Sequence, residues 1–190
     1  MRGLLKARSS GVMLLLALAL AGCGSSAASL RIPFKSPALV DGALPAAFTC
    51  DGKDISPPLE WGAVPSSTRE LAVFIFGLTP KPSTGTQPVR NTISVEWAVA
   101  GLNPALHRLA AGRLPPGAHV GRGSDSKARY SICPAKGKRK RYQFALYAVP
   151  ASVEIAPSFE AIPILRNLAS TASPTAAKVG GSFVATYERR

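Results

Sequence analysis

Residues 70–76, ELAVFIF, decide the fold class, together with a similar stretch at 92–102, TISVEWAVAGL. Each is a short, nearly continuous apolar run, which is typical of a buried strand. In the second run only Glu96 interrupts the middle. Further along the chain, the stretches YQFALYAV at 142–149 and FVATY at 183–187 predict two more strands. The sequence therefore predicts a mostly β domain.

Helices are few in this pattern, and both lie late in the chain. Ser158 can cap a helix over 159–168, although Pro163 limits that helix or moves its start. A second, short helix is predicted over 173–180, because Pro is favoured at the first helical position and Gly at the end. We expect the connections to be turn and loop, including 80–89 and 115–126.

The composition bounds the class of protein. The chain has 190 residues, and a compact domain commonly has about 100–200 residues. Its 17 Gly and 17 Pro follow no period, so collagen is excluded and many turns are expected. The formal net charge is +13, but 46% of the residues are hydrophobic, which is too many for a disordered polycation. The composition does not identify an enzyme.

Residues 1–22 have the pattern of a lipoprotein signal peptide. Basic residues without an acid precede the apolar run at 11–21, which is too short to span a bilayer, since spanning needs about 20 residues. The run ends LAGC at 20–23, which matches the bacterial lipoprotein processing box. Cys23 would then carry the lipid (a diacylglycerol and a palmitate-type acyl chain). The alternative is an ordinary secretion signal that happens to end in a cysteine.

Processing before Cys23 would anchor the chain to the outside of the membrane. We expect a lipidated N-terminus and tether over 23–42 and a folded domain over 43–190, with a net charge of about +10 once the basic signal is lost. Lipid on Cys23 leaves Cys50 and Cys133 in an oxidising compartment, where an even pair favours a disulfide. Two buried free thiols are the alternative.

No constellation of residues predicts catalysis, a metal site or a cofactor. The two histidines, His107 and His119, have no third ligand at metal spacing. Cys50 has no base nearby in sequence. Asp51 and Asp54 lie in a turn-like segment, where we expect hydrogen bonds to backbone amides rather than acid–base work.

The densest charge is the run KGKRKR at 136–141. An exported, lipid-anchored chain does not meet genomic DNA, so nucleic acid is not the expected partner. Anionic lipid headgroups or wall polymers are better candidates, because each basic residue near an anionic surface contributes about 1 kcal/mol. An envelope protein is a further candidate partner. The alternative is a solvated hairpin tip that binds nothing in particular. The contact candidates are Lys136, Lys138, Arg139 and Arg141.

Several segments resemble the phosphatidylethanolamine-binding protein family, in its bacterial Raf-kinase-inhibitor-like branch. The segments are FTCDG at 48–52, ISPPLEW at 55–61, VP at 64–65, EW at 96–97, YSICP at 130–134, RYQFALYA at 141–148 and the closing strand at 181–189. The resemblance implies a sandwich-like fold of two antiparallel sheets with short peripheral helices. It also implies a small pocket at one end of the sheets that takes phosphate-like anions.

The chain departs from the family at that pocket. The family's contributors are an aspartate turn, a His before Trp, and the His and Tyr of a His-Arg-Tyr strand. Here no aspartate remains around 76–80, Glu96 and Lys140 stand at the two histidine positions, and only Tyr142 matches. The pocket candidates by this resemblance are Glu96, Lys140, Tyr142, Tyr130 and Asp51.

The two replacements carry opposite charges. Glu96 would repel an anion, whereas an ion pair between Glu96 and Lys140 would satisfy the carboxylate and occupy the anion's place. If Lys140 instead points outward, Glu96 pairs elsewhere. The resulting expectation is an exported, lipid-anchored, non-catalytic binding or interaction protein whose usual anion pocket is lost or rebuilt. The alternative, by analogy with family members, is an inhibitor of a protease or another envelope enzyme.

Overall fold

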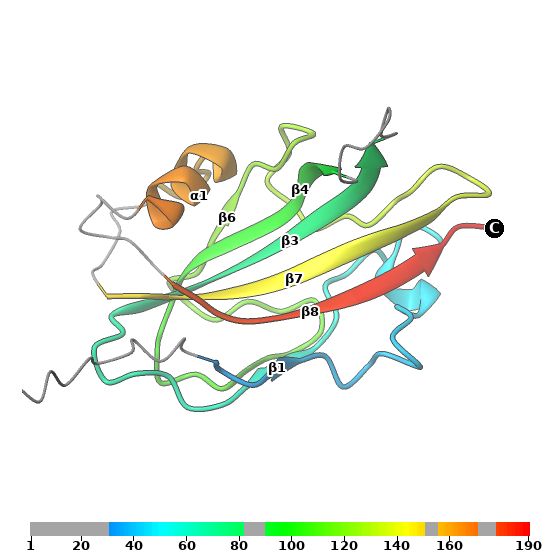
Figure 1. Cartoon of the computed structure of the whole chain (residues 1–190). Coiled ribbons are helices and arrows are strands. Elements are labelled where there is room, and N and C mark those ends of the chain that lie inside the picture. Colours follow the sequence, from blue (N-terminus) through cyan, green and yellow to red (C-terminus); the bar gives the residue numbers. More distant parts are fainter. Residues whose placement is uncertain (1–30, 82–89, 151–155, 171–177) are drawn as a thin grey trace, which may run out of the picture.

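Four long strands dominate the computed structural model, which describes residues 31–81, 90–150, 156–170 and 178–190 (Figure 1). They are β3 (Glu70–Lys81), β4 (Arg90–Leu102), β7 (Arg139–Val149) and β8 (Lys178–Glu188). All four agree with the apolar runs of the sequence, and each is longer than its run. With the short β6 (His119–Gly121) they form an antiparallel sheet in the order β6-β4-β3-β7-β8. The signal peptide and Cys23 lie outside the described residues.

A second, smaller sheet lies against the first. It consists of β1 (Phe34–Lys35), β2 (Leu59–Trp61) and β5 (Arg108–Leu109) in the order β1-β2-β5, and a 3-10 turn, η1 (Ala46–Phe48), follows β1. Both sheets are antiparallel. The expected two-sheet, sandwich-like, mostly β fold is therefore confirmed.

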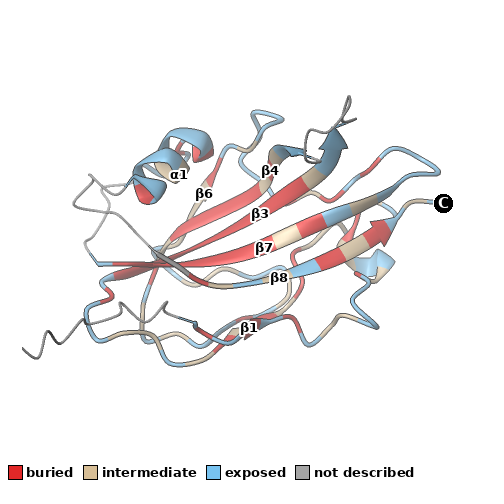
Figure 2. Ribbon diagram, in the orientation of Figure 1, coloured by how far each residue is buried: buried red, intermediate tan, exposed pale blue. Residues whose placement is uncertain are grey.

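The three central strands of the large sheet, β4, β3 and β7, are buried on both faces over most of their length, as Figure 2 shows. The inner face of the large sheet packs against the small sheet through a cluster that includes Leu71, Val73 and Phe144. Its outer face packs against α1 (Ala161–Ala169) through a cluster that includes Phe74 and Tyr147. Burial on both faces explains why these strands are continuous apolar runs rather than alternating ones.

The helix predictions are partly right. The helix predicted over 159–168 exists as α1, but it begins at Ala161, and no side chain caps it, so the expected cap by Ser158 is wrong. Pro163 fits in the first turn, where its missing N–H is not needed. The second predicted helix is wrong at its end, because residues 178–180 belong to β8; the rest of it lies outside the described residues.

Three boundaries also differ from expectation. Residues 80–81, expected in a loop, are the end of β3, and the rest of that loop, 82–89, lies outside the described residues. The segment 115–126 contains β6, a strand too short to show a periodic pattern. The folded domain starts before Ala43, since Ile32 and Phe34 are 3% and 8% exposed and pack in the core between the sheets. The boundary predicted at residue 43 is therefore too late, because a hydrophobic pair flanking one proline gives little strand signal. No helix among the described residues is long and apolar enough to cross a membrane.

Candidate functional site

An ion pair crosses the inner face of the large sheet near one end. Lys140 Nζ on β7 lies 2.7 Å from Glu96 Oε1 on β4, so the pair bridges the intervening strand β3. The Ser94 hydroxyl donates to the same Glu96 oxygen at 2.7 Å and lies 3.3 Å from Lys140 Nζ. The expected ion pair is thus present, and Lys140 does not point outward with the loop. The side chains of Lys140 and Glu96 are only 23% and 20% exposed.

A β-bulge places Glu96 on this face. Ile75 pairs with Trp97, but the next residue of β3, Phe76, pairs with Val95, so Glu96 is an extra residue in β4. An inserted residue disturbs the strict alternation of side chains between the two faces of a strand. The bulge therefore allows Glu96 to share the inner face with Trp97, its direct neighbour in sequence, as well as with Ser94.

Gly77 forms the floor beneath the ion pair. It pairs with Ser94 of β4 on one side and with Tyr142 of β7 on the other. A Cβ on Gly77 would overlap both Glu96 Oε1 and Lys140 Nζ. The charged groups therefore rest directly on the backbone of β3. Gly77 and Ser94 were not among the candidates from the sequence, and the available signal was a glycine inside a strand, which often marks a close approach.

Two buried tyrosines border the pair. Tyr142 is 1% exposed, and Lys140 Nζ lies 5.6 Å from the centroid of its ring. Burial, reinforced by the Glu96 carboxylate, raises the pKa of Tyr142 well above its ordinary value. Tyr130 packs edge-on against Trp97, and its hydroxyl donates to the Phe48 carbonyl at 2.6 Å. Burial, followed by the Asp54 charge, raises the pKa of Tyr130 as well. Both phenols are neutral hydrogen-bonding groups at physiological pH.

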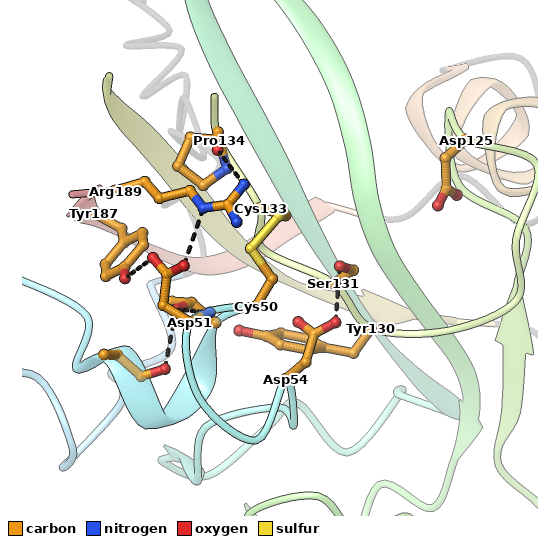
Figure 3. Close-up of a disulfide and its surroundings, with 12 residues drawn as sticks. Cys50, Asp51, Asp54, Asp125, Tyr130, Ser131, Cys133, Pro134, Tyr187 and Arg189 are labelled. Atoms are coloured by element: carbon orange, nitrogen blue, oxygen red, sulfur yellow. Dashed lines mark hydrogen bonds and ion pairs between the residues drawn. A yellow bond between two sulfur atoms is a disulfide. The ribbon is translucent and has the colours of Figure 1, made fainter. Parts of the chain in front are cut away.

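Asp51, also a pocket candidate, lies in a turn beside β8, the strand next to β7, and makes no contact with the ion pair. Its carboxylate accepts hydrogen bonds from the Tyr187 hydroxyl at 2.6 Å and from Arg189 Nε at 3.0 Å (Figure 3). The hydrogen bond from Tyr187, followed by Arg189, lowers the pKa of Asp51, and the same bond raises the pKa of Tyr187. Tyr187 is the β-sheet partner of Lys140, so the two polar clusters are neighbours.

The disulfide and Asp54 hold the adjacent loops together. Cys50 and Cys133 are bonded, which confirms the predicted pairing (Figure 3). Asp54 has a positive φ of 48°, and its Oδ2 accepts from Ser131 at 3.0 Å and from Arg129 at 3.2 Å. The expectation that these aspartates bond backbone amides is therefore wrong: the hydrogen bonds that their carboxylates accept come from side chains distant in sequence. A cavity of about 310 Å³ opens between Asp54 and the Trp97–Tyr130 pair.

The basic run 136–141 covers a turn and the start of β7. Gly137 has a φ of 68°, and its N–H donates to the Arg189 carbonyl at 2.8 Å, which ties the turn to the end of β8. Lys140 is turned inward. The four contact candidates, Lys136, Lys138, Arg139 and Arg141, are exposed. Among the residues described, no three His, Cys, Asp or Glu side chains come together as a metal site.

Comparisons with known proteins agree with this architecture. The family model "Phosphatidylethanolamine-binding protein" matches residues 35–183. A Mycobacterium tuberculosis protein named "Putative lipoprotein LppC" is 31% identical over 148 residues, covering 76% of this chain and 69% of the relative. UPF0098 protein YbcL of Escherichia coli is 33% identical over 105 residues, covering 54% of this chain and 56% of the relative.

Two crystal structures show a similar fold. The E. coli YbcL structure, titled a new member of the mammalian PEBP family, matches with a TM-score of 0.67 and 22% identity over 84% of this chain and 99% of that one. The PEBP homolog CT736 of Chlamydia trachomatis matches with a TM-score of 0.68 and 23% identity over 85% of this chain and 100% of that one.

Proposed function

Since the chain belongs to the phosphatidylethanolamine-binding protein family, we propose that it is a non-catalytic, envelope-anchored member in which an internal ion pair replaces the bound anion. The chain would be exported, lipidated on Cys23, and would act as a binding or interaction protein through its surface rather than through the usual pocket.

The observation that carries this proposal is the 2.7 Å contact between Lys140 and Glu96 over Gly77. An ammonium that already has a carboxylate partner offers little net charge to a phosphate. The Glu96 carboxylate would in addition repel the phosphate at close range. An entering anion would have to break the pair and leave Glu96 partly buried without its counter-charge, which is costly.

Neighbouring groups support the same conclusion. The Ser94 hydroxyl, a hydrogen-bond donor that a phosphate could use, already donates to Glu96. Tyr142 is buried beneath the pair, so its phenol presents almost no surface to solvent. The two positions that carry histidines in the family are therefore occupied by charged groups that satisfy each other.

The anchoring part of the proposal rests on the processing box at 20–23. It is supported by the lipoprotein name of the mycobacterial relative. The disulfide between Cys50 and Cys133 also suits an oxidising, extracytoplasmic compartment.

Titration of the protein with phosphoethanolamine and with inorganic phosphate, followed by NMR, tests the pocket. We expect no saturable shift in wild type. The double variant Glu96→His/Lys140→His should bind at least about tenfold more tightly, which corresponds to ~1.4 kcal/mol. The matched control is Lys35→His/Glu60→His, which changes an exposed pair elsewhere. Tight wild-type binding that shifts the Glu96 and Lys140 signals would overturn the proposal.

Mass spectrometry of the N-terminal peptide from membranes tests the anchor. We expect a mature chain that begins at Cys23 and carries acyl chains, and a Cys23→Ala variant that is not acylated. An unmodified mature N-terminus would overturn the anchoring part and leave the pocket test unaffected. The alternative of an envelope-enzyme inhibitor remains a prediction, and capture of a protease from an envelope extract would favour it.

A further inference from the structure

Among the described residues, large apolar side chains are exposed at one end of the outer face of the large sheet. α1 packs over the other end of this face, near Phe74 and Tyr147 (Figure 1). The register places two further cross-strand rows on this face: Val95, Phe76, Gln143 and Val184, then Ile93, Leu78, Arg141 and Thr186. In the first row Val95 and Phe76 are still buried in the cluster that contains α1. Ile93 is 61% exposed and Val184 is 40% exposed, and both are large apolar side chains in contact with solvent.

Basic side chains border these apolar residues. Arg139 and Arg141 alternate with the inward-facing Lys140 and Tyr142 on β7, so they belong to the outer face. Lys136 and Lys138 follow in the turn next to Arg139. All four are exposed, and none makes an ion pair within the described parts of the chain. We call Ile93, Leu78, Val184 and these four basic residues the tip surface.

We propose that the tip surface binds an anionic lipid membrane, with the four basic side chains on the headgroups and the three apolar side chains against the interface. The combination of exposed aliphatic side chains and unpaired cations fits a layer that is apolar inside and negative at its boundary. A soluble anion would use the cations and leave the exposed aliphatic side chains unexplained, and a neutral apolar partner would leave the cations unexplained.

The length of the N-terminal chain allows this orientation. This step rests on the proposed anchoring at Cys23. The chain enters the domain at Ile32, whose N–H donates to the Gly180 carbonyl at the start of β8. From Gly180 to Glu188, which pairs with Arg139, β8 spans about 26 Å at ~3.3 Å per residue. Nine residues from Cys23 to Ile32 reach at most about 30 Å, so the lipid and the tip surface can lie at one membrane.

Vesicle co-sedimentation tests the surface without the lipid. The exported chain from residue 23, with Cys23→Ser, is mixed with phosphatidylcholine vesicles with or without phosphatidylglycerol. We expect binding only with the anionic lipid, and Arg139→Gln/Arg141→Gln should weaken it about 30-fold at roughly fivefold per basic residue. Ile93→Ser should weaken it further. The matched control, Arg69→Gln/Arg113→Gln, removes the same charge from exposed sites elsewhere and should weaken it by less than about fivefold.

Several results would overturn the proposal. One is an equal loss in the two double variants, which would mean that only net charge matters. Another is binding that does not depend on phosphatidylglycerol. A third is binding to a soluble anionic wall polymer with no binding to vesicles, which would assign the cations to a different partner. Circular dichroism of each variant shows whether a loss comes from unfolding.

Trypsin cleavage at the tip tests the orientation on the lipidated chain. On anionic vesicles, cleavage after Lys138 to Arg141 should be slowed at least about tenfold relative to detergent. Deleting residues 24–28 shortens the reach to about 14 Å, which is less than the span of β8, and should restore cleavage. Unchanged protection in the deletion would refute the orientation. If mass spectrometry shows no acylation, the proposed anchoring is refuted instead. The vesicle test of the unlipidated chain would still show whether the tip surface binds anionic lipid.

Discussion

A double-mutant cycle on Glu96 and Lys140 measures how strongly the ion pair is coupled. The two atoms lie 2.7 Å apart, and an effective dielectric constant of about 20 gives an attraction of about 6 kcal/mol. Desolvation offsets most of this attraction, because the side chains are only 20% and 23% exposed. Exposed pairs contribute about 0–1 kcal/mol, whereas breaking a buried pair costs ~3–5 kcal/mol. We therefore expect a coupling energy of about 2 kcal/mol.

The variants are Glu96→Gln, Lys140→Met and the double variant, each unfolded in urea with the disulfide intact. We expect each single variant to lose more than half of the free energy of unfolding that the double variant loses. The reason is that each single variant leaves one charge without its partner. At about 2–4 °C per kcal/mol for a chain of this size, a coupling of that magnitude corresponds to a shift in Tm of about 4–8 °C.

The Lys35–Glu60 pair is the internal control. Its nitrogen and oxygen lie 3.5 Å apart, and its side chains are 71% and 44% exposed. The same cycle on that pair should give a coupling energy below about 1 kcal/mol. If Glu96 and Lys140 show no stronger coupling than this control, the pair does not form a specific, partly desolvated contact. The argument that it takes the place of an anion would then fail.

Three further outcomes follow from named contacts. Gly77→Ala should lower the free energy of unfolding by about 1–2 kcal/mol, because its methyl group would displace the ion pair. The same substitution in the Glu96→Gln/Lys140→Met background should cost less, and urea unfolding measures both. Asp51→Asn should destabilise the protein at pH 7. The pKa of Asp51 is lower in the folded protein than the unfolded value of 3.8, so its carboxylate stabilises the fold above that pH. This stabilisation is lost as the pH falls through the folded pKa. The difference in unfolding free energy between wild type and Asp51→Asn should therefore disappear in acid. Cys50→Ala/Cys133→Ala should cost about 2–5 kcal/mol in equilibrium unfolding, because the bond closes a loop with a sequence separation of 83.

The parts of the fold that the sequence predicts are those with a long local signal. Strands β3, β4 and β7 each carry five or more buried or half-buried positions in a row, β8 carries four in alternation, and the apolar runs revealed them. Strands β1, β2 and β5 have two or three residues each, which is too few for any period. Their pairing depends on tertiary packing. Gly181 illustrates this, since a Cβ there would overlap Ile32 and Phe34 at the β1 end of the chain.

The candidate site was likewise predictable only where the sequence carries a local signal. Opposite charges at Glu96 and Lys140 predicted the pair, because a partly buried carboxylate needs a counter-charge. The bulge that turns Glu96 inward depends on the register between β3 and β4, which no single segment of sequence records. The partners of Asp51 lie at Tyr187 and Arg189, more than 130 positions away, so its cluster could not be found from local spacing.

The alternation of β7 connects the inner ion pair with the outer surface. In the sequence, KGKRKR is a single run of charge, and every member looks equally available to a partner. In the sheet, Lys140 faces inward and is neutralised by Glu96, while Arg139 and Arg141 face outward and make no ion pair with the described residues. A shift of one residue in the register of β7 would reverse this division, placing two arginines over Gly77 and one lysine outside. The site and the tip surface therefore depend on the same register, and neither could be rebuilt without changing the other.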